Sequence, residues 1–189
     1  MNFGNFANGG KAVLILLSLI ILSACATVNS TMTAEQSKEY FFQGSNISWD
    51  LSEKRVKKDA AKKDKGKRAA QKADLIAKLE TALENEFKNT PSGSNPMRFE
   101  VRITDYYFAN VLGTVWGAQS NFVGDVDVID VSTGETLATV TDLAGNTKSV
   151  GGLLGLAVKA ATKPDVGGVI ASSFAKRLRK KYAKVEQTT

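Results

Sequence analysis

Residues 97–104 read MRFEVRIT, and the alternation in this stretch decides the fold. Phe99, Val101 and Ile103 are apolar, while the residues around them are arginine, glutamate and arginine. A period of two predicts a β-strand with one face buried and the other face in solvent. The rest of the chain therefore has to supply a layer that covers the apolar face of a sheet.

Two helices are predicted to form that layer, one before the strand and one near the end of the chain. Residues 74–88 (DLIAKLETALENEFK) repeat an apolar residue every four positions, and Asn89-Thr90-Pro91 ends the pattern. Residues 165–184 carry a second apolar stripe, and cations in the last turns face the negative end of the helix dipole. The stripes are Leu75, Leu79, Leu83 and Phe87, then Ile170, Phe174, Leu178 and Tyr182; the cations are Lys176, Arg177, Arg179, Lys180, Lys181 and Lys184.

Three further strands are predicted beside the first. Residues 46–51 (NISWDL) place Ile47 and Trp49 on one face. Residues 122–131 (FVGDVDVIDV) alternate, residues 132–134 (STG) make a turn whose glycine suits left-handed backbone, and residues 135–143 return as the partner strand. A glycine-rich loop, 145–161, leads to the last helix. The order predicts an α+β domain, a small, mostly antiparallel sheet with two helices packed on it.

The residue types offer little to an enzyme. The chain has no histidine, which excludes Ser-His and Cys-His nucleophilic pairs and histidine-ligated metals. Asp125, Asp127 and Asp130 are candidate metal ligands, but they fit the outward half of an alternating strand and lack the spacing of a calcium loop. Residues 151–155 (GGLLG) lack the Lys and Ser/Thr of a phosphate-binding loop, and Ser173 with Lys176 lies in mid-helix. We therefore expect no catalytic residue, no metal site and no cofactor.

Residues 53–72 (EKRVKKDAAKKDKGKRAAQK) are the most biased segment, with ten Lys or Arg against three Asp or Glu. Their net charge is +7, so the remainder of the chain, whose total is +6, sums to −1. Alanine and lysine favour helix, Gly66 weakens it, and almost no apolar stripe is present, which predicts a solvated basic extension leading into the next helix. This segment either binds anionic lipopolysaccharide or cell-wall polymer, or only keeps a helix solvated. The candidate anion-binding residues are Lys54, Arg55, Lys57, Lys58, Lys62, Lys63, Lys65, Lys67 and Arg68.

Residues 106–116 (YYFANVLGTVW) form a second candidate surface. Four aromatic residues fall within eleven positions, namely Tyr106, Tyr107, Phe108 and Trp116. Exposed aromatic side chains commonly anchor protein interfaces, which would make this segment a docking site for an envelope protein. The alternative is that the same side chains close the core at the end of a strand.

Cys25 is the only cysteine, and it follows an apolar run at 12–22 (AVLILLSLIIL). This run has the length of a signal-peptide core and falls short of the roughly 20 residues of a spanning helix. Ala24-Cys25-Ala26 fits an ordinary signal-peptidase site, whereas Leu22-Ser23-Ala24-Cys25 matches the bacterial lipoprotein signature, the lipobox, at all four positions. In proteins that this stretch resembles, the chain is cut between Ala24 and Cys25, and the cysteine carries a covalent lipid with acyl chains such as palmitate. Three acyl chains give firm anchoring, and Ala26 rather than Asp after the cysteine favours the outer membrane in such lipoproteins.

A looser resemblance covers residues 46–184. The stretch from FEVRITDYYF through VDVIDVSTGETL to GGLLG and the closing helix resembles uncharacterised bacterial lipoproteins whose domain is similar to the amino-terminal domain of TolB. The curli secretion lipoprotein CsgG and the penicillin-binding-protein activator LpoB share that general domain type. The resemblance implies a domain without catalytic residues, and the basic segment at 53–72 departs from it.

Together these features divide the chain into four parts. We expect a signal peptide at 1–24, a lipidated cysteine and flexible tether at 25–45, an α+β periplasmic domain at 46–184 and a disordered tail at 185–189. The expected function is a lipid-anchored, non-enzymatic adaptor for an envelope protein at the periplasmic face of the outer membrane. The alternatives are electrostatic binding of an anionic envelope polymer and membership of a secretion or pore assembly. The compartment argues against nucleic acid as a partner.

Overall fold

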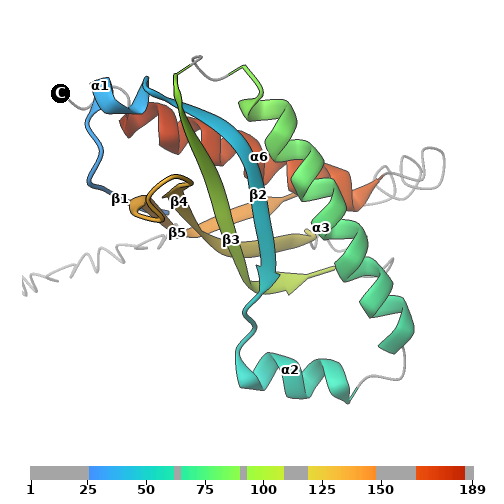
Figure 1. Cartoon of the computed structure of the whole chain (residues 1–189). Helices are drawn as coiled ribbons and strands as arrows, with labels where there is room; N and C mark the ends of the chain where they lie inside the picture. Colours follow the sequence, from blue (N-terminus) through green and yellow to red (C-terminus); the bar gives the residue numbers. More distant parts are fainter. Residues whose placement is uncertain (1–25, 62–64, 90–92, 109–118, 148–164, 186–189) are drawn as a thin grey trace, which may run out of the picture.

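The structure of the chain, a computed structural model, describes residues 26–61, 65–89, 93–108, 119–147 and 165–185. Within these ranges five strands form one sheet in the order β1-β5-β4-β3-β2 (Figure 1). β2 and β3 are parallel, and every other neighbouring pair is antiparallel. The predicted α+β class with a mostly antiparallel sheet is therefore confirmed. The strands are β1 (Thr27–Ser30), β2 (Tyr40–Trp49), β3 (Asn95–Tyr107), β4 (Asn121–Asp130) and β5 (Thr136–Asn146).

Four helices accompany the sheet in the described residues: α1 (Ala34–Ser37), α2 (Glu53–Ala60), α3 (Lys65–Phe87) and α6 (Val166–Val185). α2 and α3 form the crossover from β2 to β3, because two parallel strands cannot be joined by a tight hairpin. α3 and α6 pack against each other, α3 against β2 and α6 against β5 (Figure 1). The helices predicted at 74–88 and 165–184 are confirmed, although α3 already begins at Lys65.

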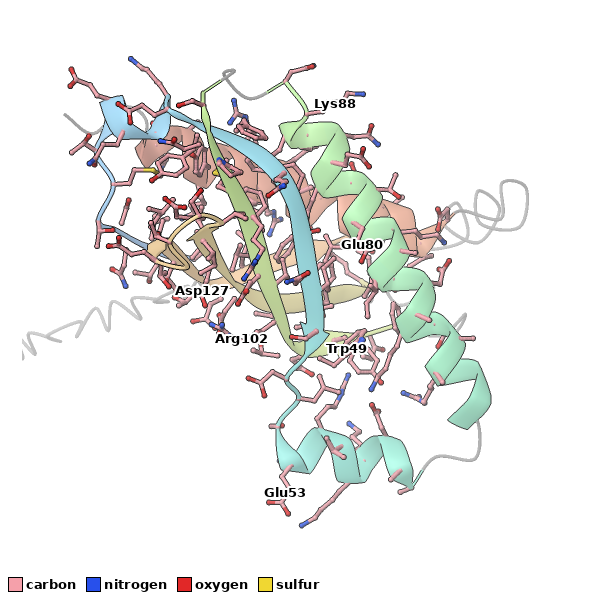
Figure 2. All side chains as sticks on the ribbon, viewed as in Figure 1. Trp49, Glu53, Glu80, Lys88, Arg102 and Asp127 are labelled. Carbon is pink, nitrogen blue, oxygen red and sulfur yellow. The ribbon has the colours of Figure 1, made fainter. Side chains whose placement is uncertain are left out.

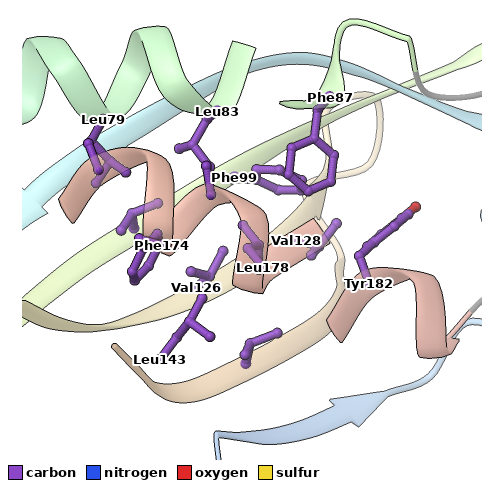
Figure 3. Close-up of a cluster of buried hydrophobic side chains, with 14 of the residues drawn as sticks. Leu79, Leu83, Phe87, Phe99, Val126, Val128, Leu143, Phe174, Leu178 and Tyr182 are labelled. Carbon is purple, nitrogen blue, oxygen red and sulfur yellow. The ribbon is translucent and has the colours of Figure 1, made fainter. Parts of the chain in front are cut away.

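The core fills the space between α3, α6 and one face of the sheet (Figure 3). Phe87 of α3 packs edge to face on Phe99 of β3, with 4.7 Å between the ring centroids. β5 and α6 approach so closely at Gly145 that a Cβ there would lie 2.5 Å from the carbonyl oxygen of Ile170. Every residue of the two predicted helix stripes is buried: Leu75, Leu79, Leu83, Phe87, Ile170, Phe174, Leu178 and Tyr182.

The hairpin between β4 and β5 is confirmed, and its turn explains the third aspartate of the alternating strand. Gly134 has φ +76°, the left-handed conformation that glycine adopts without steric cost. The Asp130 carboxylate accepts the backbone N–H groups of Ser132 at 2.7 Å and Thr133 at 3.1 Å. Tyr40 of β2 donates its hydroxyl to the same carboxylate at 3.0 Å. Asp130 is therefore a turn-capping residue.

The expectation of a flexible tether is wrong for the described part of residues 25–45. β1 pairs with β5 from Thr27 onward, so the sheet begins within two residues of Cys25. Met32 is 7% exposed and belongs to the core cluster, and α1 is capped reciprocally by Thr33 and Gln36. The polar composition of this segment misled the prediction, because an edge strand is held through its backbone hydrogen bonds to its neighbour rather than through apolar side chains.

The strand predicted at 46–51 is the second half of a longer strand, since β2 already pairs with β3 at Tyr40. The predicted signal peptide lies outside the described residues. Most of the glycine-rich loop and all but the first residue of the predicted tail also lie outside them.

Candidate functional site

Trp49 and Tyr106 lie side by side at one end of the sheet, because β2 and β3 run parallel and both finish there. Their ring centroids are 5.3 Å apart in an edge-to-face arrangement. α2 follows β2 directly and lies at the same end, as the labels of Trp49 and Glu53 show in Figure 2. The structure thus brings together parts of the two surfaces that the sequence predicted separately, the basic segment at 53–72 and the aromatic segment at 106–116.

Local signals explain why α2 is a helix although it has no buried residue. Ser52 is its N-cap and accepts the backbone N–H of Arg55 at 3.4 Å. Glu53 lies in the first turn, where a negative charge is favourable, and pairs with Lys57 one turn later at 2.6 Å. α2 is therefore a surface helix whose position depends on the cations and the aspartate on one of its sides.

Asp59 is the centre of these contacts. Its carboxylate accepts the hydroxyl proton of Tyr106 and pairs with Arg68 at 3.3 Å and Lys72 at 3.2 Å. Burial raises the pKa of the Asp59 carboxyl, but the hydrogen bonds from Tyr106 and Lys72 and the nearby positive charges outweigh it, so this pKa lies below its ordinary value. Burial and the bond to Asp59 both raise the pKa of the Tyr106 phenol. Asp59 therefore stays ionised and Tyr106 neutral around pH 7.

Two cations of the basic segment lie over the aromatic rings. The guanidinium of Arg55 lies 4.4 Å from the Tyr106 ring centroid, and its Nε lies 3.4 Å from Asp105. Lys72 Nζ lies 5.0 Å from the ring centroids of both Trp49 and Tyr106. Cation–π contacts of this kind are worth about 0.5–1 kcal/mol when exposed and more when desolvated. The basic segment is thus docked on the body of the domain, which corrects the expectation of a wholly solvated extension.

The predicted anion-binding residues therefore fall into two groups within the described chain. Arg55 and Arg68 already form contacts with Asp105, Tyr106 and Asp59, so these two side chains are not fully available to a ligand. Lys62 and Lys63 lie outside the described residues, as do the side chains of Lys65 and Lys67. The remaining lysines of α2 are exposed, and we call them the α2 basic surface: Lys54, Lys57 and Lys58.

The predicted aromatic docking site is not supported as a unit. Tyr106 is 2% exposed and belongs to the core cluster, so it closes the core at the strand end and cannot anchor a partner. Phe108 packs on Tyr106 with 5.4 Å between ring centroids and is partly buried. Tyr107 is 45% exposed, and Trp116 lies outside the described residues. Period-two alternation explains the difference, because neighbours on a strand point to opposite faces.

The face of the sheet away from α3 and α6 carries polar pairs. Arg102 donates to Asp127, which also accepts the hydroxyl of Thr139 at 2.8 Å. Asp125 accepts the backbone N–H of Asp142 at 2.9 Å. In the part of the chain that the structure describes, no cluster of three or more His, Cys, Asp or Glu residues could hold a metal ion. The aspartates of β4 therefore form hydrogen bonds with β3, with β5 and with the turn between β4 and β5.

Sequence reasoning missed Asp59, Trp49 and Lys72 as parts of this site. An aspartate within a run of lysines was a usable signal, since an isolated carboxylate in a basic helix is a natural ion-pair acceptor. The sequence places Trp49 on the same strand face as Ile47, but the contact of its ring with Lys72 depends on how α3 crosses the sheet end. Cys25 lies outside the described residues, and no described helix is long and apolar enough to span a membrane.

Comparison with known proteins gives limited structural likeness. No protein-family model matches the sequence, and no curated protein matches it significantly. A PelC dodecamer from Paraburkholderia phytofirmans matches with a TM-score of 0.41 and 11% identity, covering 82% of this chain and 96% of that one. A "putative lipoprotein" from Caulobacter crescentus CB15 matches with a TM-score of 0.37 and 14% identity, covering 65% and 99%.

A minor lipoprotein from Acinetobacter baumannii matches with a TM-score of 0.27 and 10% identity, covering 78% of this chain and 94% of that one. The structural neighbours thus include proteins described as lipoproteins. A likeness at these TM-scores assigns neither a family nor a function to this chain, and the functional argument depends on its own residues.

Proposed function

We propose that this chain is a lipid-anchored, non-enzymatic binding module of the cell envelope whose α2 basic surface binds an anionic envelope polymer. The anchor in this proposal is Cys25 of the lipobox, at the periplasmic face of the outer membrane. The polymer class is an acidic cell-wall polymer, recognised through its phosphate or carboxylate groups; lipopolysaccharide, the other polyanion expected from the charge of the segment, lies in the outer leaflet and would require α2 to face the membrane.

The observation that carries the proposal is the separation of α2 from the anchored end of the chain. The strand order places β1 at one edge of the sheet and β2 at the other, and α2 follows β2 (Figure 1). Because the sheet begins at Thr27, a lipid on Cys25 would hold the β1 edge close to the membrane. α2 would then face away from that membrane and present its lysines to the periplasm.

The docking of α2 supports binding as well as orientation. Asp59, Arg55 and Lys72 fix the helix on the sheet end, so its outward side keeps one position. Lys54, Lys57 and Lys58 are exposed on that helix, and only Lys57 has an ion-pair partner among the described residues. A fixed array of exposed cations attracts polyanions without paying the full entropy of ordering a flexible segment.

The anchor is tested by replacing the thiol. Cys25→Ser should leave an uncleaved precursor that takes up no labelled fatty acid, whereas Ser23→Ala, which keeps a small residue at its place in the lipobox, should still be acylated and cleaved. Fractionation of the acylated chain should place it with the outer membrane. Acyl labelling of the Cys25→Ser chain would refute the anchor.

The α2 basic surface is tested by a pull-down from detergent-solubilised envelope with the mature chain as bait. Lys54→Gln, Lys57→Gln and Lys58→Gln together should lower polymer retention at low salt by tenfold or more, because about 1 kcal/mol per cation is lost. A matched variant, Lys38→Gln, Lys88→Gln and Lys176→Gln, removes the same charge from exposed positions elsewhere and should retain the polymer.

Raised salt should release the polymer from the native chain, since exposed charges are screened. Equal retention by the native chain and the α2 variant would contradict the proposal. A discrete protein retained at raised salt would replace it with the adaptor role expected from the aromatic segment.

A further inference from the structure

A second basic surface lies beside the β1 edge of the sheet, whereas α2 docks on the ends of β2 and β3. The last turns of α6 bring four cations beside Ala26, the first described residue, and together they line a cleft of about 300 Å³. Asp142 of β5 lines the same cleft and is the one acidic residue among the described residues of its lining. We call the cations the α6 basic surface: Arg177, Lys180, Lys181 and Lys184.

Hydrogen bonds hold this end of α6 against the sheet edge. Lys181 Nζ donates to the carbonyl oxygen of Ala26, a residue 155 positions earlier in the chain. Arg177 donates to the carbonyl oxygen of Ala144 at 3.0 Å and to the side-chain oxygen of Asn146 at 2.9 Å. β1 pairs with β5 only from Ala138 to Thr141. Arg177 therefore reaches the backbone of β5 at Ala144, past the residue that pairs with the start of β1. The cations are thus placed at one short stretch of the sheet edge.

Covalent geometry then fixes where a lipid on Cys25 would be. Cys25 is bonded to Ala26, so their Cα atoms are about 3.8 Å apart. Lys181, which donates to Ala26, therefore lies within about one Debye length of the attachment point at physiological salt, about 8 Å, and the other three cations line the same cleft. Exposed charges at such a distance from a membrane feel its surface potential.

We propose that the α6 basic surface binds the phosphate headgroups of anionic lipids in the leaflet that holds the acyl chains of Cys25. The inference rests on the proposed lipid anchor, and it adds a contact that the anchor alone does not supply. Acyl chains on Cys25 keep the β1 edge near the membrane but leave the domain free to tilt about the attachment point, whereas four cations beside that point hold the β1 edge against the headgroups. α2, which docks on the ends of β2 and β3 at the other side of the sheet, is then held away from the membrane.

The test is a lysine footprint of the acylated mature chain in vesicles. The chain is reconstituted into phosphatidylcholine vesicles and into vesicles that also contain phosphatidylglycerol, and a water-soluble amine-reactive reagent reports the reactivity of each lysine by mass spectrometry. In the anionic vesicles, Lys180, Lys181 and Lys184 should react on the order of fivefold more slowly, from about 1 kcal/mol per surface cation. Lys54, Lys57 and Lys58 should react equally in both, and raised salt should remove the protection.

A matched pair of variants checks that the protection reports orientation. With Lys180→Gln, Lys181→Gln and Lys184→Gln, the acylated chain should lose its orientation, and the lysines of the α2 basic surface should become protected in anionic vesicles. With Lys54→Gln, Lys57→Gln and Lys58→Gln, protection of the α6 basic surface should remain unchanged. Far-UV circular dichroism checks that both variants are folded.

Three results would overturn the inference: equal reactivity of the α6 lysines in the two vesicle types, stronger protection of α2 than of α6 in the native chain, or protection of α6 by inorganic phosphate alone in phosphatidylcholine vesicles. The third result would assign the surface to a free anion rather than to a lipid. A chain that takes up no fatty acid removes the anchor and this inference together. A chain that is acylated but unprotected removes this inference alone.

Discussion

The contact between Asp59 and Tyr106 predicts a measurable energetic coupling between α2 and the core. Tyr106→Phe removes the hydroxyl that donates to Asp59 but leaves the ring in place. A hydrogen bond to a charged group contributes about 1.5–3 kcal/mol. Asp59 keeps Arg68 and Lys72 in the variant, and its side chain is 14% exposed, so we expect the lower part of this range, about 1.5–2 kcal/mol of unfolding free energy.

Asp59→Ala should cost more, about 3 kcal/mol, because it leaves the buried Tyr106 hydroxyl without its acceptor and removes the anion shared by two cations. In the double variant the hydroxyl is absent, so part of that penalty disappears. The coupling energy of the cycle should therefore be about 1–2 kcal/mol.

The assay is urea unfolding of the mature chain with Cys25→Ser, monitored by circular dichroism and by tryptophan fluorescence, to which Trp49 contributes from its place against Tyr106. Tyr182→Phe provides a control tyrosine, because its hydroxyl contacts Met97 in a different part of the core. Asp59→Ala and Tyr182→Phe should be additive within about 0.5 kcal/mol. A coupling energy between Asp59 and Tyr106 that is also below about 0.5 kcal/mol would refute the docking of α2 on the sheet end.

Three further results follow from the same structure. Gly145→Ala should lower the unfolding free energy by about 1–3 kcal/mol, because its Cβ would meet the Ile170 carbonyl at 2.5 Å, while Gly44→Ala, with nothing within 4 Å, should leave the urea midpoint nearly unchanged. Met32→Ala should cost about 2–5 kcal/mol if the segment after β1 is part of the core, and a change below about 0.5 kcal/mol in urea unfolding would return it to a tether. The pKa of Asp59 is lowered in the folded state, so the stabilisation by this carboxylate is complete above the ordinary pKa of 3.8 and is lost as the pH falls through the folded-state pKa. Asp59→Asn should therefore flatten the acid limb of the plot of unfolding free energy against pH. Identical slopes below pH 4 in the two proteins would contradict this.

The sequence was informative wherever burial follows a local period. The alternation around Phe99 and the four-residue spacing from Leu75 to Phe87 predicted a strand and a helix, and both lie in the core. The turn at Gly134 was predicted from the same kind of local signal, since only a few residue types adopt left-handed backbone without strain. The lipobox at Cys25 is also local, and it stays a prediction.

The candidate surfaces could be predicted only as segments. The sequence identified the lysines of 53–72 and the aromatic residues after 105. It left open whether those rings close the core, as Tyr106 does, or dock a partner, and it did not indicate that Asp59 joins the two segments. A run of charges looks solvated when its partners are distant in sequence, and Asp59 and Tyr106 are 47 positions apart. Parallel pairing of β2 and β3 brings them together, and that pairing is a long-range choice of the whole sheet.

The sequence by itself determined the element types, the stripes that form the core, the charge of the basic segment and the thiol of the lipobox, because each is carried by neighbouring residues. Only the tertiary structure decided that residues 27–30 form an edge strand, that Asp59 docks α2 on Tyr106 and that the cations of α6 lie beside Ala26. The reason is physical: backbone pairing and ion pairs join groups that are distant along the chain, and their geometry exists only once the sheet order has been set.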